Sequence, residues 1–341
     1  MTHTNRPLAS PLRRPLPETT RRRCVVTGAA GFIGSQLATR LHEQGWAVTG
    51  IDGFTDSYDP VEKHQRAAAL ERLGGVSIVV GDLVTSNLES LFDGAEVVFH
   101  LAGRAGVRAS FDIETRYVHD NVTATEAVVA AARPGGVRRI VYASSSSVYG
   151  NSPTPFREDL PPAPISPYGR TKLEAERLCL EAASSGLEAV ALRYFTVYGP
   201  GQRPDMGLRI FAEAALHGRP LTVFGDGTQR RDFTYVDDIV DATIAAADAP
   251  ASGLAVNIGG GSSVTLLEVL DLLGSLVARP VDVRFHPFAR GDVLATEADS
   301  TRAASLLGFR AHVPFERGFR AEVAWVRDRS ELVQAEEARS A

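Results

Sequence analysis

The stretch Cys24–Gly34 constrains the fold more than any other part of the chain. A short apolar run leads into three regularly spaced glycines, and an amphipathic pattern follows that ends at Gly45. This succession predicts a buried strand, a tight turn and a helix. Glycines at this spacing let the backbone approach a pyrophosphate, and the helix N-terminus offers N–H donors to it. The candidate dinucleotide-binding residues of the turn are Gly28, Gly31, Phe32, Ile33 and Gly34.

A carboxylate at the end of the next apolar run supports the same interpretation. The run Trp46–Ile51 ends in Asp52, 21 residues beyond Gly31, where an acidic side chain can hold both ribose hydroxyls. No arginine or lysine follows before Lys63, so a 2′-phosphate would meet an unopposed negative charge. NAD is therefore favoured over NADP. A glycine turn in some other α/β protein is the alternative that remains open.

Alternating strand and helix patterns predict the fold class. Further strands are expected at Val76–Val80, Glu96–Leu101 and Arg139–Ala143, with helical patterns between them. This alternation predicts an α/β fold, a Rossmann-type doubly wound parallel sheet with a smaller mixed α/β substrate-binding lobe. Ligands of such sheets lie beyond the C-terminal ends of the strands. The further cofactor candidates at those ends are Asp82, Leu83, Leu101 and Ala102, although the Asp82 side chain could equally cap a helix.

Shifts in composition divide the chain into three parts. Residues 1–22 combine four prolines with five arginines and predict a disordered, basic tail. A paired-arginine export signal is the alternative, but glycines interrupt the apolar stretch that should follow it. The NAD-binding domain is expected over residues 23–193 plus about 232–259, and the substrate-binding lobe over about 194–231 plus 260–333, because glycine and proline end the regular pattern after residue 193.

Composition argues against several classes of function. The formal net charge of −5 disfavours nucleic acid as the main partner, and no apolar run approaches the roughly 18 residues of a membrane span. The two cysteines, Cys24 and Cys179, are too few for a disulfide framework or a zinc cluster. They fit a cytoplasmic protein without a metal site. The single histidines His286 and His312 are expected to be solvated.

A tyrosine and a lysine in the middle of the chain are the candidate reactive pair. If Ser166 caps a helix and Pro167 begins it, Tyr168 and Lys172 lie one turn apart on the same face. A cation beside a phenol lowers the pKa of the phenol, which is near 10 in water. An ordinary pair on a helix surface is the alternative. The serine run at 144–147, at the end of an expected strand, lies shortly before the pair.

Several of these segments together carry a family resemblance. TGxxGFIG, GDL, HLA, VYG and YGxxK resemble the extended short-chain dehydrogenase/reductase superfamily, and within it the NAD-dependent nucleotide-sugar epimerase/dehydratase family, from about residue 24 to at least 292. The resemblance implies tightly held NAD, Tyr168 as acid/base, and Lys172 on the nicotinamide ribose. Ser145, three residues before the valine of VYG, then corresponds to the serine that hydrogen-bonds the reacting sugar hydroxyl. Asn121 matches an asparagine that we carry over as structural only.

The residues beside Ser145 separate the chemistries found in this family. Its dehydratases place an Asp-Glu pair where this chain has Ser146 and Ser147, because elimination of water needs a further acid and base. UDP-glucuronate decarboxylases typically carry glutamate at the position of Ser147. Both carboxylates are missing here, which favours epimerisation at C4 of a UDP-sugar through a 4-keto intermediate.

The resemblance also implies a set of substrate contacts. Among family members the chain looks most like the UDP-glucuronate 4-epimerases, partly through the Ala105–Ser110 stretch that contains the substrate candidate Arg108. Thr196 and Arg203 match residues that bind the C6 carboxylate, with help from the hydroxyls of Ser144 and Ser146. The residues that match contacts to the nucleotide diphosphate and ribose are Arg231, Arg290 and Asp292.

Three other interpretations stay open from the sequence. The chain could be a UDP-glucose or UDP-N-acetylglucosamine 4-epimerase, or a UDP-glucuronate decarboxylase. It could also be a non-catalytic NAD-sensing or RNA-binding module, although a sensor would have no need of Ser145, Tyr168 and Lys172 together. The family resemblance further implies a homodimer formed through helices near residues 114–133 and 167–185.

Overall fold

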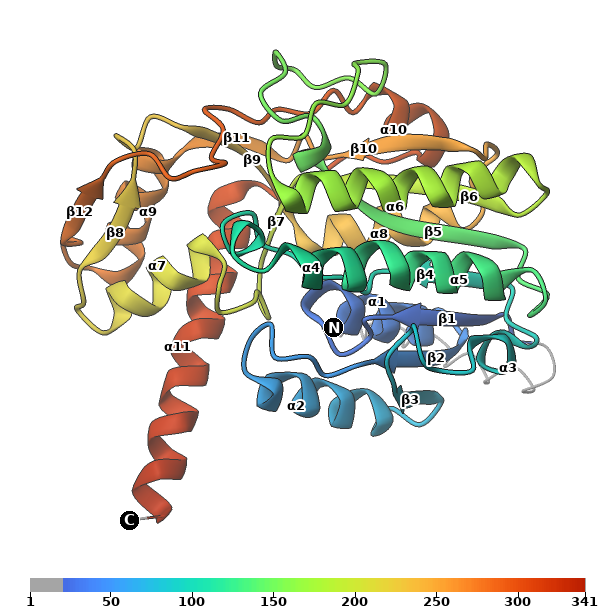
Figure 1. The fold of residues 1–341 in the computed structure, drawn as a ribbon. Helices are drawn as coiled ribbons and strands as arrows, with labels where there is room; N and C mark the ends of the chain where they lie inside the picture. The colour runs from blue at the N-terminus through green and yellow to red at the C-terminus, as the bar shows by residue number, and fades with distance from the viewer. Residues whose placement is uncertain (1–20, 341) are drawn as a thin grey trace, which may run out of the picture.

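The computed structural model describes residues 21–340, with side chains through Leu332. Residues 1–20 of the predicted tail lie outside the described residues. Seven parallel strands form the main sheet (Figure 1), in the order β10-β6-β5-β4-β1-β2-β3. The strands are β1 (Arg23–Thr27), β2 (Ala47–Asp52), β3 (Val76–Val80), β4 (Val97–His100), β5 (Arg139–Ser145), β6 (Glu188–Tyr194) and β10 (Leu254–Ile258).

The strand order explains both the burial of this sheet and the place of its ligand crevice. The β4 residues are all buried, as expected for a parallel strand that is covered by helices on both faces. The order reverses between β1 and β4, which lie side by side although two strands separate them in the sequence. Such a reversal opens a crevice at the C-terminal strand ends. The predicted Rossmann-type α/β fold is confirmed.

Helices cover both faces of the main sheet (Figure 1). Against one face pack the apolar sides of α1 (Phe32–Glu43), α2 (Pro60–Glu71), α8 (Val236–Ala246) and α10 (Thr301–Leu307). Against the other face pack α3 (Leu88–Phe92), α5 (Ala124–Ala132) and α6 (Pro167–Ser184). Short helical segments complete this layer: η2 (Ala109–Phe111), α4 (Glu114–Tyr117), the π-helical η3 (Val118–Thr123) and η4 (Ser146–Val148).

A smaller group of elements lies beside the main sheet, at the left of Figure 1. Its strands form a three-stranded sheet, β11-β9-β7, and a parallel pair, β12-β8. These elements are β7 (Thr196–Tyr198), β8 (Leu221–Phe224), β9 (Arg230–Tyr235), β11 (Ser262–Thr265), β12 (Val283–His286), α7 (Gly207–Leu216), α9 (Leu266–Val277) and α11 (Phe315–Ser340). They enclose a hydrophobic cluster of their own, built around side chains such as Phe211, Leu273 and Phe319.

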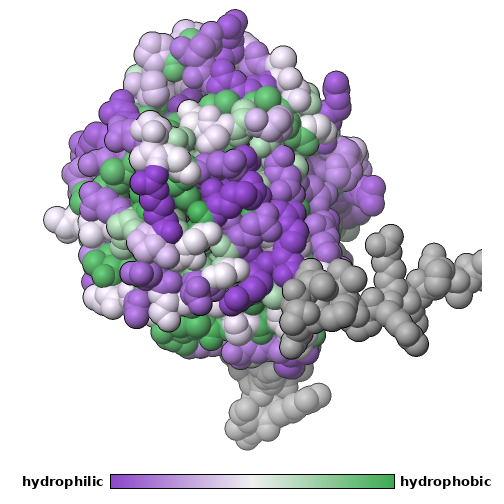
Figure 2. All heavy atoms as spheres, turned by 90° about the vertical axis from the view of Figure 1, so that its right-hand side faces the viewer, coloured by the Kyte–Doolittle hydropathy of each residue, from purple (hydrophilic) through white to green (hydrophobic). Residues whose placement is uncertain are grey.

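No helix in residues 21–340 is long and apolar enough to cross a membrane. Hydrophilic side chains dominate the side that faces right in Figure 1, and hydrophobic ones appear there in small, separate patches (Figure 2). The same described residues contain no cluster of histidine, cysteine and acidic side chains that could hold a metal ion.

Candidate active site

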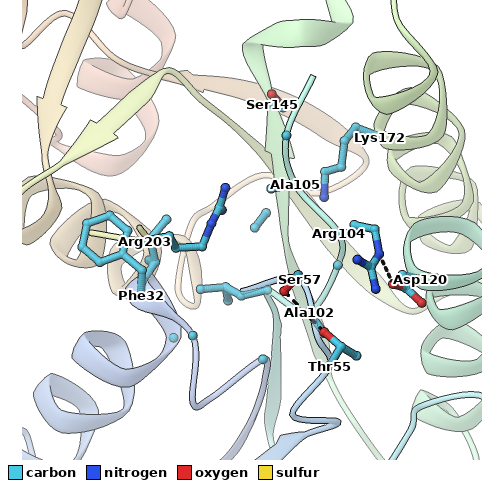
Figure 3. Close-up of a pocket in the computed structure, with 18 of the residues that line it drawn as sticks. Phe32, Thr55, Ser57, Ala102, Arg104, Ala105, Asp120, Ser145, Lys172 and Arg203 are labelled. Atoms are coloured by element: carbon cyan, nitrogen blue, oxygen red, sulfur yellow. Dashed lines mark hydrogen bonds and ion pairs between the residues drawn. The ribbon is translucent and has the colours of Figure 1, made fainter. Parts of the chain in front are cut away.

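A cavity of about 460 Å³ opens at the C-terminal ends of the main-sheet strands. Figure 3 shows Lys172 and Arg203 reaching toward it from opposite sides. All the predicted cofactor residues line it: Gly28, Gly31, Phe32, Ile33, Gly34, Asp52, Asp82, Leu83, Leu101, Ala102, Tyr168 and Lys172. The candidate substrate residues that line it are Ser144, Ser145, Ser146, Tyr168, Thr196 and Arg203.

The glycine turn is shaped for close approach of a dinucleotide. Gly28 has φ +70°, and a Cβ there would lie 2.9 Å from the Ala102 Cα atom. A Cβ on Gly34 would collide with the Gly28 carbonyl oxygen, so only glycine lets α1 pack this closely on the turn. Gly31 is the N-cap of α1 and provides no side-chain cap. The first N–H groups of α1 therefore remain available to an anion, and the residues present fit a bound pyrophosphate.

Asp52 links the glycine turn to the end of β2. Its carboxylate accepts the Ala30 N–H at 3.0 Å and the Phe54 N–H at 2.8 Å. Lys63 also reaches this part of the cavity, where its Nζ donates to the Thr55 carbonyl at 2.7 Å. Burial lowers the pKa of Lys63, and the nearby Asp52 carboxylate opposes that change. The fold thus brings a cation close to Asp52, which the spacing along the sequence did not reveal.

The Asp82 side chain caps a turn and not the helix that the sequence suggested, because the next helix, α3, has Asn87 as its N-cap. Its carboxylate accepts the Val84 N–H at 2.7 Å and so caps the turn after β3. Asp82 and Leu83 nevertheless line the cavity. Asn121 also has a structural place, since its Oδ1 accepts the Arg104 N–H at 2.7 Å and its Nδ2 donates to the Thr171 hydroxyl at 3.0 Å.

Tyr168 and Lys172 project from the first turns of α6. Ser166 accepts the Gly169 N–H at 3.1 Å and Pro167 begins the helix, as the sequence predicted. Desolvation in the cavity raises the pKa of Tyr168, while the Ser145 hydroxyl and the Arg203 cation lower it. Burial lowers the pKa of Lys172 to about 7. Desolvation is the largest of these effects, so the pKa of Tyr168 is raised in this structure, and its lowering by Lys172 stays a prediction.

The serine run bends away from β5 at the cavity wall. Ser145 accepts the Ser147 N–H at 3.1 Å and is the N-cap of η4. Ser144 is 3% exposed, and its hydroxyl donates to the Glu176 carboxylate at 2.6 Å. Its predicted contact with substrate therefore stays a prediction, because that hydroxyl already has a protein partner.

Thr196 and Arg203 face the cavity from the chain that follows β6. Thr196 is the first residue of β7, and Arg203 lies in the loop before α7. Arg203 donates to both carboxylate oxygens of Asp205, at 2.9 and 3.0 Å. Asp205, Tyr58 and Lys63 also line the cavity, although the sequence did not single them out as site residues. For Asp205 the signal was its position, only two residues after Arg203.

The remaining substrate candidates gather beside the cavity rather than on its wall. Arg108 pairs with Asp292 at 2.9 Å, and its guanidinium lies 4.1 Å from the centre of the Phe224 ring. Burial and the nearby Arg108 cation lower the pKa of Arg231, whereas the Asp292 carboxylate raises it. The charges of Arg108, Arg231 and Asp292 are therefore close to one another. The Arg290 guanidinium lies 4.1 Å from the centre of the Phe111 ring.

Comparison with known proteins identifies the family. Residues 24–259 match the model of the NAD dependent epimerase/dehydratase family. The chain belongs to this family. NAD is therefore the cofactor of this chain. The mostly parallel sheet and the crevice at its strand reversal agree with that assignment.

Relatives in this family resemble the chain over nearly its whole length. It is 37% identical to a UDP-glucuronate 4-epimerase of Thermodesulfobacterium geofontis, covering 91% of this chain and 98% of that one. A UDP-glucose 4-epimerase of Mycolicibacterium smegmatis is 35% identical, covering 91% and 100%. The crystal structure of a UDP-glucuronic acid 4-epimerase from Bacillus cereus, in complex with UDP-glucuronic acid and NAD, matches with a TM-score of 0.87, 36% identity and coverage of 90% and 99%.

Proposed function

We propose that this protein epimerises a UDP-sugar at C4 and that UDP-glucuronate, converted to UDP-galacturonate, is its preferred substrate. The observation that carries the proposal is that Ser145, Tyr168 and Arg203 line one cavity with the NAD turn. Two of them can move a proton at a sugar hydroxyl, and the third can bind a carboxylate. The uronate relatives support the choice of substrate.

The chain supplies proton transfer and orientation. When bound, NAD supplies a reversible hydride acceptor for the sugar C4. Tyr168 takes the proton of the C4 hydroxyl and returns it to the product, and Ser145 holds that oxygen by a hydrogen bond. Lys172 is 6% exposed, and burial lowers its pKa while the nearby Glu176 raises it. The charge of Lys172 therefore depends on its surroundings in the cavity. The cavity must let the 4-keto sugar rotate before the hydride would be returned, so that C4 would be inverted.

The carboxylate of the proposed substrate calls for a buried cation and several donors. Arg203 supplies the cation, and Thr196 and Ser146, which carry hydroxyl groups, line the same cavity. A 4-keto uronate is a β-keto acid that loses CO₂ readily. We propose that these contacts hold the carboxylate bond near the sugar plane, away from the geometry that favours decarboxylation.

The decisive test uses purified protein without added cofactor. UDP-glucuronate and UDP-glucose are supplied separately, and the anomeric protons are followed by NMR. We expect UDP-galacturonate from the first substrate, which would also show that NAD stays bound through purification. UDP-galactose as the only product would overturn the choice of substrate in favour of a neutral hexose. Conversion of neither sugar would favour an NAD-binding module.

We also propose the organisation of the chain that the sequence suggested. It comprises an NAD-binding domain at 23–193 plus about 232–259 and a nucleotide-sugar-binding lobe at about 194–231 plus 260–333. The separate hydrophobic cluster around Phe319 supports this division, with the exception that α10 packs against the main sheet. A cytoplasmic location is supported by the two buried, unbonded cysteines.

A homodimer through the helices near 114–133 and 167–185 is part of the same proposal. Val118, in the first of these segments, is apolar yet 42% exposed. An aspartate there would place a charge in the interface, so Val118→Asp should lower the mass measured by light scattering from dimer toward monomer. A monomeric mass for the unaltered protein would overturn the proposal.

A further inference from the structure

The four residues that precede Arg203 are each held in place by a side chain from a helix. We call residues 199–202 the Arg203 support segment. The four holding contacts are Glu322 on the Gly199 N–H (2.9 Å), Gln36 on the Pro200 carbonyl (2.9 Å), Arg66 on the Gly201 carbonyl (2.8 Å) and Arg209 on the Gln202 carbonyl (2.7 Å). Loop backbone usually relies on water for such bonds. This segment instead has a fixed set of protein partners.

Arg209 holds the residue next to Arg203 at two points. Besides its bond to the Gln202 carbonyl, its own N–H donates to the Gln202 side-chain oxygen at 3.0 Å. The Gln202 side chain, 1% exposed, spans back to the Val197 carbonyl at 3.1 Å. The backbone from β7 to Arg203 is therefore tied to the first turn of α7.

A single buried carboxylate orients the arginines of this arrangement. Glu62 on α2 is 5% exposed and accepts two hydrogen bonds from Arg209, at 2.6 and 2.9 Å. It also accepts one from Arg66 at 3.1 Å and one from Arg329 of α11 at 2.9 Å. Bidentate pairing fixes the plane of a guanidinium as well as its distance. Glu62 thereby sets the direction in which Arg209 meets Gln202.

The same network reaches the cofactor side of the cavity. Arg66 donates through one nitrogen to the Gly201 carbonyl and through another to the Tyr58 hydroxyl at 2.9 Å. Tyr58 lines the cavity, whereas Glu62, Arg66 and Arg209 do not. These three charged residues therefore act on the cavity only through the groups that they hold.

We propose that Glu62 and Arg209 are positioning residues that fix Arg203 in the orientation required to bind the carboxylate of the substrate. The pair sets specificity for a uronate over a neutral sugar without touching either. This inference rests on the proposed function, because it concerns the same arginine. A buried ion pair that only joined α2 to α7 would affect both sugars alike.

The test measures binding of UDP-glucuronate and UDP-glucose to the NAD-containing protein by calorimetry. In Arg209→Met, Glu62 keeps Arg66 and Arg329 as partners, so the remaining buried charge is not left unpaired. We expect the Kd for UDP-glucuronate to rise about tenfold and the Kd for UDP-glucose to change by less than about twofold. Arg209→Lys, which can still pair with Glu62, should recover part of the preference.

Two further variants keep the result interpretable. Glu62→Gln/Arg209→Met removes both charges of the pair, while the amide oxygen at position 62 can still accept from Arg66 and Arg329. This double variant serves if the single variant does not fold, with the same expected loss of preference. Arg320→Ala breaks an exposed pair with Glu316, 3.1 Å long, on α11 and should leave both Kd values unchanged. A folded Arg209→Met or double variant that retains the parent's preference for UDP-glucuronate overturns the positioning role. An unaltered protein without that preference overturns the proposed substrate instead.

Discussion

The Ser144 hydroxyl donates a 2.6 Å hydrogen bond to the carboxylate of Glu176, one turn beyond Lys172 on α6. The same carboxylate forms a bidentate pair with Arg193 of β6, at 2.6 and 3.0 Å, and both charged residues are almost fully buried. The end of β5, which carries the serine run, is thus joined to the helix that carries Tyr168. The relative position of Ser145 and Tyr168 depends on this buried pair.

Ser144→Ala should therefore affect stability more than substrate affinity. Loss of a buried hydrogen bond to a charged group costs about 1.5–3 kcal/mol, and we expect that decrease in the free energy of unfolding by urea denaturation. The KM for UDP-glucuronate should change less than about twofold. Ser146→Ala is the matched variant for comparison. Ser146 also lines the cavity but, in contrast to Ser144, is proposed to act through contact with the substrate. A large rise in KM with unchanged stability for Ser144→Ala would restore its predicted role as a substrate contact.

Tyr168→Phe should abolish most of the epimerase activity while leaving the fold and bound NAD intact. General acid–base groups contribute about 10²- to 10⁴-fold, so kcat should fall by at least about 10². The measurement is the initial rate by NMR, together with the absorbance of bound cofactor. Tyr235→Phe removes a phenol outside the cavity lining and should retain the parent's rate. Activity of Tyr168→Phe at the parent's rate would refute the proposed mechanism.

Arg203→Ala should weaken turnover of UDP-glucuronate by raising KM about tenfold or more, because the cavity loses the cation for the carboxylate. Without that restraint the 4-keto intermediate should lose CO₂ more often, which would give a UDP-pentose by-product detectable by mass spectrometry. UDP-glucose, which lacks the carboxylate, provides the control substrate. Unchanged turnover together with no UDP-pentose would contradict the assignment of Arg203.

Glu322→Gln should stabilise the protein above neutral pH. Burial raises the pKa of Glu322 from 4.5 to about 8, and one of its carboxylate oxygens lacks a partner among the described residues. Between those two pH values the folded state keeps a proton that the unfolded chain releases, so stability falls as pH rises. Glutamine keeps the acceptor for the Gly199 N–H without the charge. The gain should grow with pH to on the order of 5 kcal/mol at pH 8.5, and equal stability curves for both proteins from pH 5 to 8.5 would refute it.

The sequence alone determined the features that depend on local order. The spacing of Gly28, Gly31 and Gly34 required a tight turn between a strand and a helix, and alternation of apolar runs required a parallel sheet. Because the C-terminal ends of parallel strands meet at one edge, the residues after each strand had to converge on one cavity. Ser166 and Pro167 likewise set the start of α6 and placed Tyr168 and Lys172 on one face.

Only the tertiary structure decided which charges meet. Glu62 and Arg209 are 147 positions apart, and their contact follows from packing of α2 against the elements after β7. Lys63 comes close to Asp52 because the first turn of α2 lies at the cavity, and Ser144 faces Glu176 because β5 and α6 are neighbours. Desolvation, which sets the pKa of Tyr168 and Lys172, depends on all the atoms around a group. The local sequence does not determine which atoms surround a group. The ion pairs and the protonation states of the site residues therefore follow only from the folded structure.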